Sequence, residues 1–228
     1  MKIRTLIKVL LLITGGLCVM SKIMNWPTLE FYIKPTTVPL FFMLYWFNVK
    51  KIDLIFLLVL FLCFLGDVFL LADIQNSFMY VLSSYSVSYL LLFYFLYKNY
   101  RPLNYDTTDV IYLIIFLISW SFISYKIYDV VYEAMGDIRC LGLLYLLILY
   151  FLFIGAVFQY INSRSTKSLW FLIAILNFVI SDSCYALNKY YVPSIEFEII
   201  NSIYQLLAVF FLVKFKISSP TSLRLKQF

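Results

Sequence analysis

The sequence predicts an all-α fold, a polytopic transmembrane bundle of about eight helices with both termini on the cytoplasmic side. Hydrophobic residues make up 64% of the 228 residues and charged residues only 13%, whereas a soluble domain is about half apolar and about a quarter charged. The mean hydropathy is +0.92. A soluble domain of this length has too little interior for so much apolar surface, but lipid can surround it.

Eight segments have the length and composition of membrane spans, since a helix needs about 20 apolar residues to cross the hydrocarbon core. They are residues 5–24, 29–48, 52–73, 78–97, 108–125, 139–161, 168–187 and 195–215. The linkers are short, except for residues 126–139. The first segment resembles a signal peptide but lacks a cleavage pattern, so we expect an uncleaved span. With no internal repeat, residues 1–228 are predicted to form a single domain.

The basic residues orient the bundle. Four of them, Lys22, Lys126, Arg139 and Lys189, would face the non-cytoplasmic side, and Lys34 falls inside a span. An excess of Lys and Arg marks cytoplasmic segments, which favours an even number of spans with the N-terminus inside. The cytoplasmic side would then hold thirteen, namely Lys2, Arg4, Lys8, Lys50, Lys51, Lys98, Arg101, Arg164, Lys167, Lys214, Lys216, Arg224 and Lys226.

Several classes of function are excluded by composition. The chain has no histidine, which removes His-based triads, HExxH metal sites and haem ligation by histidine. Its four cysteines form neither a CxxC pair nor a metal-ligand spacing, so no metal and no cofactor is predicted. The net charge of +6 is explained by topology rather than by nucleic-acid binding.

Three ionisable residues lie inside predicted spans, where they are costly and therefore candidates for function. Asp67 and Asp182 lie six and five residues before the ends of their spans, and Lys34 lies five after the start of its own. At about 1.5 Å per residue, all three lie roughly 7–9 Å below the non-cytoplasmic boundary. This shared depth predicts one polar pocket in the outer half of the membrane.

A structural explanation competes with this hypothesis, because Lys34 can simply neutralise one aspartate and join two helices. One lysine cannot neutralise both carboxyls, however, and a carboxyl in an apolar pocket can hold a proton near neutral pH. Two carboxyls in different surroundings can divide acid and base roles.

Other polar residues of the last two spans have weaker claims to the same pocket. Each has an alternative as a helix-to-helix hydrogen bond, a bond back to its own helix, or an interfacial lysine. These residues are Asn177, Ser181, Ser183, Asn188, Lys189 and Gln205.

Three short motifs and one glutamine occur in order along the chain: residues 33–39 (Ile-Lys-Pro-Thr-Thr-Val-Pro), residues 66–71 (Gly-Asp-Val-Phe-Leu-Leu), Ser181-Asp182-Ser183 continuing to residues 186–190 (Ala-Leu-Asn-Lys-Tyr), and Gln205. Taken together, they resemble the YhhN-type lysoplasmalogenase family of eight-span membrane proteins. The resemblance covers the second to the eighth span. In the fourth span the family usually has a histidine where this chain has Tyr89, so Tyr89 joins the candidate site.

The resemblance implies an integral membrane hydrolase that cleaves the vinyl-ether bond of lysoplasmalogens and releases a fatty aldehyde. Protonation of the alkene carbon gives an oxocarbenium ion, to which water adds, and Asp67 with Asp182 suits this chemistry as an acid/base pair. Lys34 would tune one carboxyl or hold an anion, and the partner would be a lysophospholipid. The alternatives are a lipid-binding or proton-coupled transport protein, or a degenerate family member without activity.

Overall fold

The computed structural model describes residues 3–72, 77–99 and 106–218, and these ranges contain eight α-helices, one short 3₁₀ helix and no strand. The predicted all-α class is therefore confirmed. The α-helices are α1 (Ile3–Ile23), α2 (Pro27–Trp46), α3 (Leu54–Leu71), α4 (Ser77–Lys98), α5 (Thr107–Tyr132), α6 (Arg139–Ser163), α7 (Thr166–Tyr190) and α8 (Ile195–Ile217), and the 3₁₀ helix is η1 (Glu133–Ile138).

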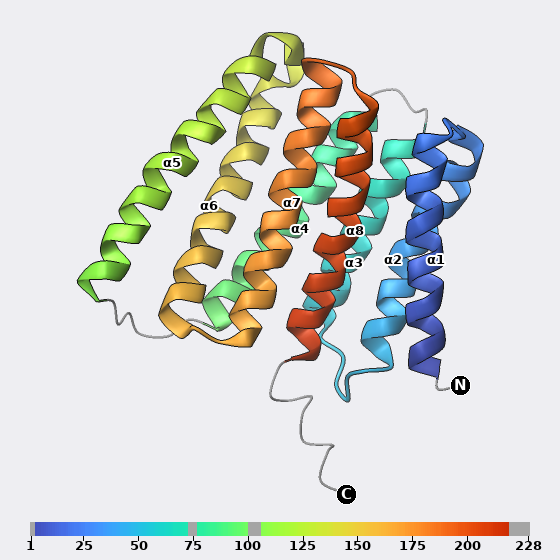
Figure 1. The fold of residues 1–228 in the computed structure, drawn as a ribbon, viewed down its shortest axis with the longest axis horizontal. Coiled ribbons are helices and arrows are strands. Elements are labelled where there is room, and N and C mark those ends of the chain that lie inside the picture. The colour runs from blue at the N-terminus through green and yellow to red at the C-terminus, as the bar shows by residue number, and fades with distance from the viewer. Residues whose placement is uncertain (1–2, 73–76, 100–105, 219–228) are drawn as a thin grey trace, which may run out of the picture.

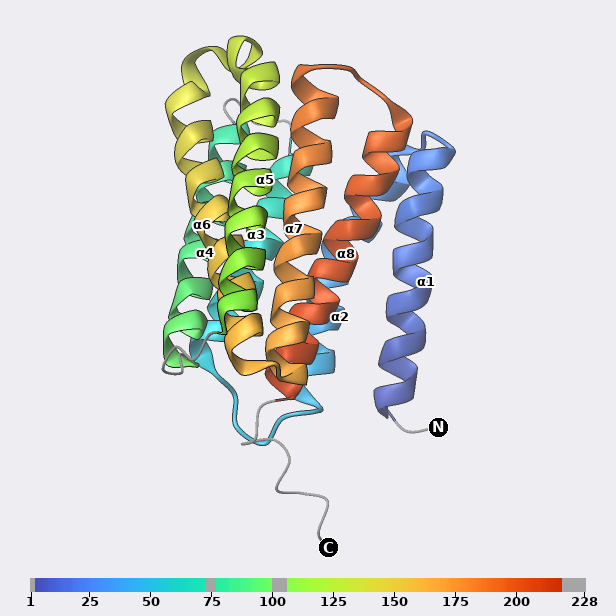
Figure 2. The same cartoon turned by 60° about the vertical axis from the view of Figure 1, so that its left-hand side comes forward.

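Successive helices run up and down to form an elongated bundle (Figure 1). The closest pairings join α7 to α8, α3 to α4 and α1 to α2, while α4 and α7 both pack against α6. Helix α5 is outermost and packs on α6 and α7 (Figure 2). Helix α1 starts and α8 ends at the lower end of the bundle as drawn in Figure 1.

Six stretches of described helix are long and apolar enough to cross a membrane, which is consistent with a multi-pass membrane protein. One of them, Thr107–Ser163, comprises α5 and α6, which are joined through η1 and the reversal of direction at Gly136. Helix α2 is not among the six, since it contains Glu30, Lys34 and several prolines and threonines. It nevertheless runs beside α1 along the bundle (Figure 1). The count of eight spans and the orientation stay predictions.

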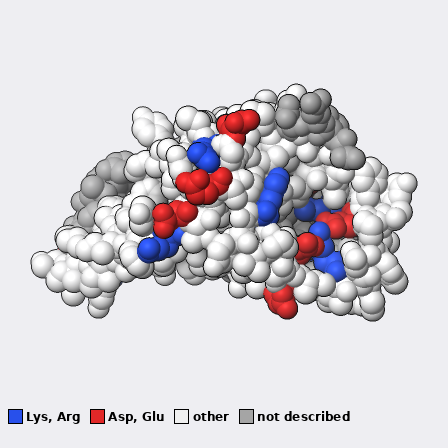
Figure 3. All heavy atoms as spheres, turned by 90° about the horizontal axis from the view of Figure 1, so that it is seen from above, with Lys and Arg blue, Asp and Glu red and all other residues white. Residues whose placement is uncertain are grey.

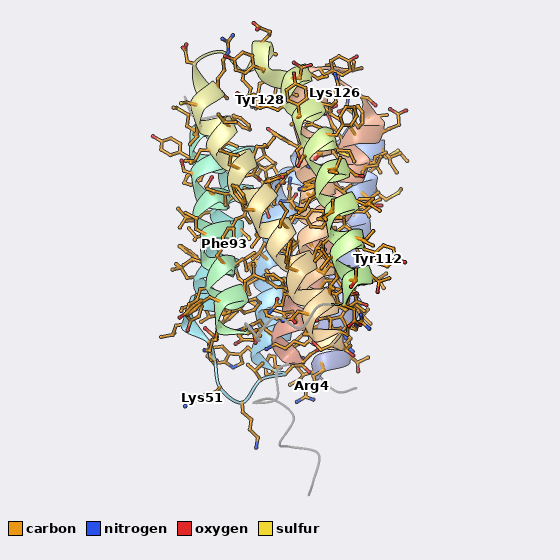
Figure 4. All side chains as sticks on the ribbon, turned by 90° about the vertical axis from the view of Figure 1, so that its left-hand side faces the viewer. Arg4, Lys51, Phe93, Tyr112, Lys126 and Tyr128 are labelled. Carbon is orange, nitrogen blue, oxygen red and sulfur yellow. The ribbon has the colours of Figure 1, made fainter. Side chains whose placement is uncertain are left out.

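Apolar side chains cover the flanks of the bundle as well as its core. Leu12 is 78% exposed and Ile118 is 66% exposed, although both are large aliphatic residues. In Figure 4, Phe93 and Tyr112 lie midway along the side of the bundle, whereas Arg4 and Lys51 lie near its lower end and Lys126 near its upper end. An apolar belt between two charged ends is the distribution expected of a protein surrounded by lipid.

The long linker predicted between the fifth and sixth spans is wrong. Helix α5 continues to Tyr132 and is followed directly by η1. Val131 is only 1% exposed, so this extension buries apolar side chains instead of running free. The reversal of direction takes place at Gly136, whose φ of 55° is readily adopted by glycine.

The two ends of the bundle differ in charge. At the upper end basic residues lie beside acidic ones (Figure 3): Lys22 contacts Glu30 at 2.8 Å and Glu198 at 3.1 Å. At the lower end lie the described members of the predicted cytoplasmic set. Lys2, Arg101, Arg224 and Lys226, also members of that set, lie outside the described residues. The basic residues expected on opposite sides of the membrane thus belong to opposite ends of one bundle.

The predicted count of eight spans, with both termini in the cytoplasm, places the upper and lower ends of the bundle in different compartments. Reporter fusions placed after Phe228 and after Asn188 should then give opposite readouts, with the Phe228 fusion active in the cytoplasm. The same compartment at both positions would show that the span count is wrong.

Candidate functional site

Asp182 of α7 is held by two tyrosine hydroxyls from neighbouring helices. Tyr89 of α4 donates to its Oδ2 at 2.6 Å and Tyr145 of α6 donates to the same oxygen at 2.5 Å. No donor among the described residues contacts Oδ1. One carboxyl oxygen is therefore fixed by the protein, and the other remains available to a ligand.

Asp67 of α3 has a matching arrangement and is almost fully buried. Tyr85 of α4 donates to its Oδ1 at 2.9 Å, and the Gln205 amide of α8 donates to that oxygen at 2.6 Å. The Gln205 amide also donates to the Tyr85 hydroxyl at 2.6 Å. The three side chains close a hydrogen-bonded triangle that links α3, α4 and α8.

Helix α4 supplies a hydroxyl to each carboxyl. Tyr85 and Tyr89 are four residues apart, which places them on one face of the helix. Their ring centroids lie 6.2 Å apart. The polar groups around Asp67 and Asp182 are thus neighbours along one helix face rather than two unrelated features.

Gly66 makes room for this arrangement. A Cβ atom on Gly66 would lie 2.6 Å from Cε2 of Tyr85, well inside contact distance. The missing side chain lets the Tyr85 ring lie against α3 and reach the carboxyl of the next residue, Asp67. Glycine is needed here for close approach, not for backbone freedom.

A cavity of about 110 Å³ opens in front of Asp182. Its walls are mainly apolar side chains such as Leu70, Phe78 and Leu149. Polar groups form only a small part of its surface, and they include those of Asp182, Tyr85, Tyr145 and Gln205. An apolar cavity with a small number of convergent polar groups is the usual form of a small-molecule site.

Lys34 and Asp67 face a second, much smaller cavity of about 20 Å³, which Gln205 also lines. Lys34 is buried, and no carboxylate oxygen of the described residues lies within 4.0 Å of its ammonium, so it is not a direct ion-pair partner of either aspartate. The structure therefore divides the single predicted pocket in two, with Gln205 shared between its parts.

A vestibule of about 220 Å³ adjoins both cavities near the upper end of the bundle. It shares Lys34 and Glu30 with the smaller cavity and Leu70, Tyr185 and Asn201 with the larger one. Lys34 thus lies between the vestibule and Asp67.

Four polar residues of α7 and α8 differ in their relation to the larger cavity: Asn177, Ser181, Ser183 and Asn201. Asn201 of α8 donates to the carbonyl of Ser181 at 2.9 Å and to its hydroxyl at 3.1 Å, and the Ser181 hydroxyl donates to the Asn201 carbonyl at 3.2 Å. Ser183 lines the larger cavity. Asn177 donates to the Ile173 carbonyl of its own helix at 2.6 Å and lines none of the three cavities.

Asn188 and Lys189 lie at the upper end of α7. The Asn188 Oδ1 accepts from the backbone N–H of Ser194 at 2.7 Å, which fixes the turn into α8, and Asn188 lines the vestibule. Lys189 is exposed, and its ammonium lies 3.4 Å from the centroid of Phe78, a wall of the larger cavity. Both residues therefore shape the entrance, and neither contacts the carboxyl of Asp67 or Asp182.

Comparison with known proteins gives one match. The YhhN family model matches residues 29–214. The chain belongs to the YhhN family. No curated protein and no solved structure gives a significant match.

Three residues at the centre of this YhhN-family site were not predicted as site residues: Tyr85, Tyr145 and Asn201. Tyrosine in a membrane helix is typical of the interfacial belt, and the chain has 20 tyrosines, so composition gave no reason to select two. The four-residue spacing between Tyr85 and Tyr89 was the one available signal. Tyr89, by contrast, was predicted from the family resemblance, and its hydroxyl contacts Asp182.

The described residues contain no group of three or more His, Cys, Asp or Glu side chains that could hold a metal ion. The donors around the two carboxyls are hydroxyl and amide groups, which bind a carboxylate or a water molecule.

Gly66→Ala should destabilise the protein, because the new methyl group displaces the Tyr85 ring from Asp67. Overpacking of this kind costs about 1–3 kcal/mol. The matched control is Gly16→Ala in α1, where a Cβ meets nothing within 4 Å; it should be neutral or slightly stabilising. Unfolding in detergent measures both variants, and equal stabilities would contradict this account of Gly66.

Proposed function

We propose that this protein is a membrane hydrolase that cleaves the vinyl-ether bond of lysoplasmalogen-type lysophospholipids. The observation that carries the proposal is the Asp182 carboxyl, held by Tyr89 and Tyr145 at the edge of an apolar cavity that Tyr85 and Gln205 also line. A carboxyl facing an apolar cavity is suited to give a proton to an alkene carbon, since bulk water does not compete there. The family resemblance leads to the same activity.

The chemistry needs one proton, one water and no cofactor. Asp182 gives its proton to the alkene carbon farther from the ether oxygen, and the electron pair of the double bond forms the new C–H bond. The carbon next to oxygen becomes an oxocarbenium ion, which the Asp182 carboxylate stabilises. Water adds to that carbon and returns a proton to the carboxylate. The resulting hemiacetal breaks its C–O bond to release an aldehyde and the glycerol hydroxyl.

Asp67 would act through Tyr85 and Gln205. Both donate to Asp67 Oδ1, and both also line the cavity of Asp182. A water between Tyr85 and Asp182 would have an acceptor on each side, so Asp67 orients the groups that hold the nucleophile. The pair of carboxyls then divides the work: Asp182 exchanges protons with the substrate, and Asp67 orders its surroundings.

The size and position of the cavities suit part of a lipid rather than the whole. A cavity of about 110 Å³ holds the reacting segment of the chain. The vestibule near the upper end lies where a phosphate headgroup would meet the interface. Its Lys22 is paired with Glu30 and Glu198 of the same vestibule, whereas no carboxylate oxygen of the described residues lies within 4.0 Å of the Lys34 ammonium. Lys34 would then attract the phosphate and hold charge near Asp67.

Asp182→Asn should abolish aldehyde release from purified protein given lysoplasmalogen, because asparagine keeps the hydrogen bonds of the tyrosines but cannot transfer a proton. General acid–base catalysis typically contributes about 10²–10⁴-fold, so we expect a loss of at least about a hundredfold. Asp67→Asn should also lower the rate substantially. Asp129→Asn on the exposed face of α5 is the matched control and should retain full activity.

The wild-type protein itself provides the sharpest test. A transport protein, a lipid-binding protein or an inactive family member would release no aldehyde from any lysophospholipid in a panel. Activity that survives in Asp182→Asn would mean that the proton comes from another group, and the site would then be misassigned.

Tyr145→Phe should slow turnover because Asp182 loses one of its two donors and is less well oriented. Loss of one orienting hydrogen bond should cost about tenfold in kcat, equivalent to about 1.4 kcal/mol. The pH–rate profile should shift as well, because Asp182 loses a hydroxyl group that donates to it. A merely structural role of Tyr145 would leave the profile unchanged. Tyr125→Phe on the exposed side of α5 controls for removal of a hydroxyl; an unshifted profile in Tyr145→Phe would argue against a positioning role.

A further inference from the structure

The largest of these cavities lies at the lower end of the bundle, away from the carboxyls of Asp67 and Asp182 along the bundle axis. It measures about 600 Å³, and α3, α4, α7 and α8 meet around it. Nothing in the proposed hydrolysis uses it. Its lining includes five lysines and one acidic residue: Lys50, Lys51, Lys98, Lys167, Lys216 and Asp53.

Buried aromatic rings form the inner wall of this lower cavity and hold two of the lysines in place. The Lys216 ammonium lies 3.9 Å from the centroid of Phe95, and the Lys167 ammonium lies 5.2 Å from that of Phe215. Phe95 and Phe215 are each 1% exposed. Lys167 also donates to the Asn99 side chain. These ammonium groups are therefore fixed before any ligand arrives, which lowers the entropy cost of binding.

The acidic residue is already engaged. Asp53 accepts backbone hydrogen bonds from Ile55 and Phe56 at the start of α3, and its Oδ2 accepts from Lys216 at 2.6 Å. Burial acts to raise the pKa of Asp53, but the Lys216 ammonium and the Phe56 N–H outweigh it and hold the pKa below its ordinary value. Asp53 thus stays ionised, and Lys216 is the lysine that it contacts directly.

Three of the remaining lysines leave an uncompensated positive charge. No carboxylate oxygen of the described residues lies within 4.0 Å of the Lys50, Lys51 or Lys98 ammonium. A topology signal alone explains lysines at this end of the bundle, but it does not require them to surround one cavity. Lys8 and Lys214 belong to the same end and do not line it. At the upper end, by comparison, Lys22 has two carboxylate partners.

We propose that this lysine-lined cavity binds a phosphate-bearing anion. Several ammonium groups around one cavity match the charge and the acceptor oxygens of a phosphate. Basic pockets between membrane helices are a known way to bind phospholipid headgroups. Val49, Ile52 and Leu54 line the same cavity and would contact the apolar part of a lipid. A soluble phosphate compound shares the chemistry, so the two sources are separated by experiment.

The experiment uses the full-length protein in phosphatidylcholine nanodiscs. Pyrophosphate is titrated while the melting temperature is followed, and binding of phosphatidylglycerol, added to the discs in a second arm, is counted by native mass spectrometry. The test variant is Lys51→Gln with Lys98→Gln, and the matched control is Lys8→Gln with Lys214→Gln. Both remove two positive charges from the same end of the bundle, but only the first pair lines the cavity.

Saturable binding of at least one probe is expected, weakened about tenfold or more in the test variant and less than about threefold in the control. Binding of pyrophosphate alone would identify a soluble anion, and binding of phosphatidylglycerol alone would identify a lipid headgroup. Failure of both probes to saturate, or equal weakening in both double variants, would overturn the proposal.

Asp53→Asn tests the same cavity with a substitution that should strengthen binding of the anion instead of weakening it. Asparagine retains the side-chain oxygen that caps α3, but it removes the negative charge that pairs with Lys216. Affinity for the probe that binds should therefore rise about threefold or more, because the Lys216 ammonium loses its carboxylate partner and can contact the anion. Unchanged or weaker binding would count against the proposal, and none of these results depends on whether the upper site hydrolyses a lipid.

Discussion

The hydrogen bonds that Tyr85 and Gln205 donate to Asp67 are the constraint around which this bundle is organised. A carboxyl inside an apolar bundle needs donors, and the only groups near enough belong to neighbouring helices. Because Asp67 draws one donor from α4 and one from α8, three helices are fixed in rotation and height. Asp182 does the same for α4, α6 and α7. Helix α4 takes part in both clusters, so a shift in its register would break them together.

This dependence connects packing to chemistry. Gly66 admits the Tyr85 ring, the ring reaches Asp67, and Gln205 closes the triangle while lining the cavity of Asp182. Each carboxyl keeps one oxygen without a donor among the described residues. The two carboxyls come from α3 and α7, and one face of α4 donates a hydroxyl to each of them. The two ends of the bundle differ in charge balance. At the upper end Lys22 contacts two carboxylates, whereas at the lower end five lysines and one carboxylate, Asp53, line one cavity.

Prediction from the sequence succeeded where one helix decides the outcome. Long apolar stretches identified the helices. The cost of a charge in lipid singled out Asp67, Asp182 and Lys34 as site candidates, and their role in function stays a prediction. It failed where two helices decide together. Residues 126–132 were predicted to belong to a linker because of their polar composition. In the structure Val131 is buried and α5 continues to Tyr132. The sequence leaves Asn177 open between the pocket and a bond across helices, and its amide donates to a carbonyl of its own helix instead.

Composition and hydropathy thus specified a helical membrane bundle and the residues whose burial demands an explanation, since these depend on the free energy of transfer of single side chains. The partners of those residues follow from helix rotation and contact, which single-residue hydropathy does not encode. Tyr85 and Tyr145 are ordinary membrane tyrosines along the chain and become carboxyl donors only once α4 and α6 lie beside α3 and α7. The division of one expected pocket into two cavities joined at Gln205 has the same origin, because only the packed side chains determine where space remains.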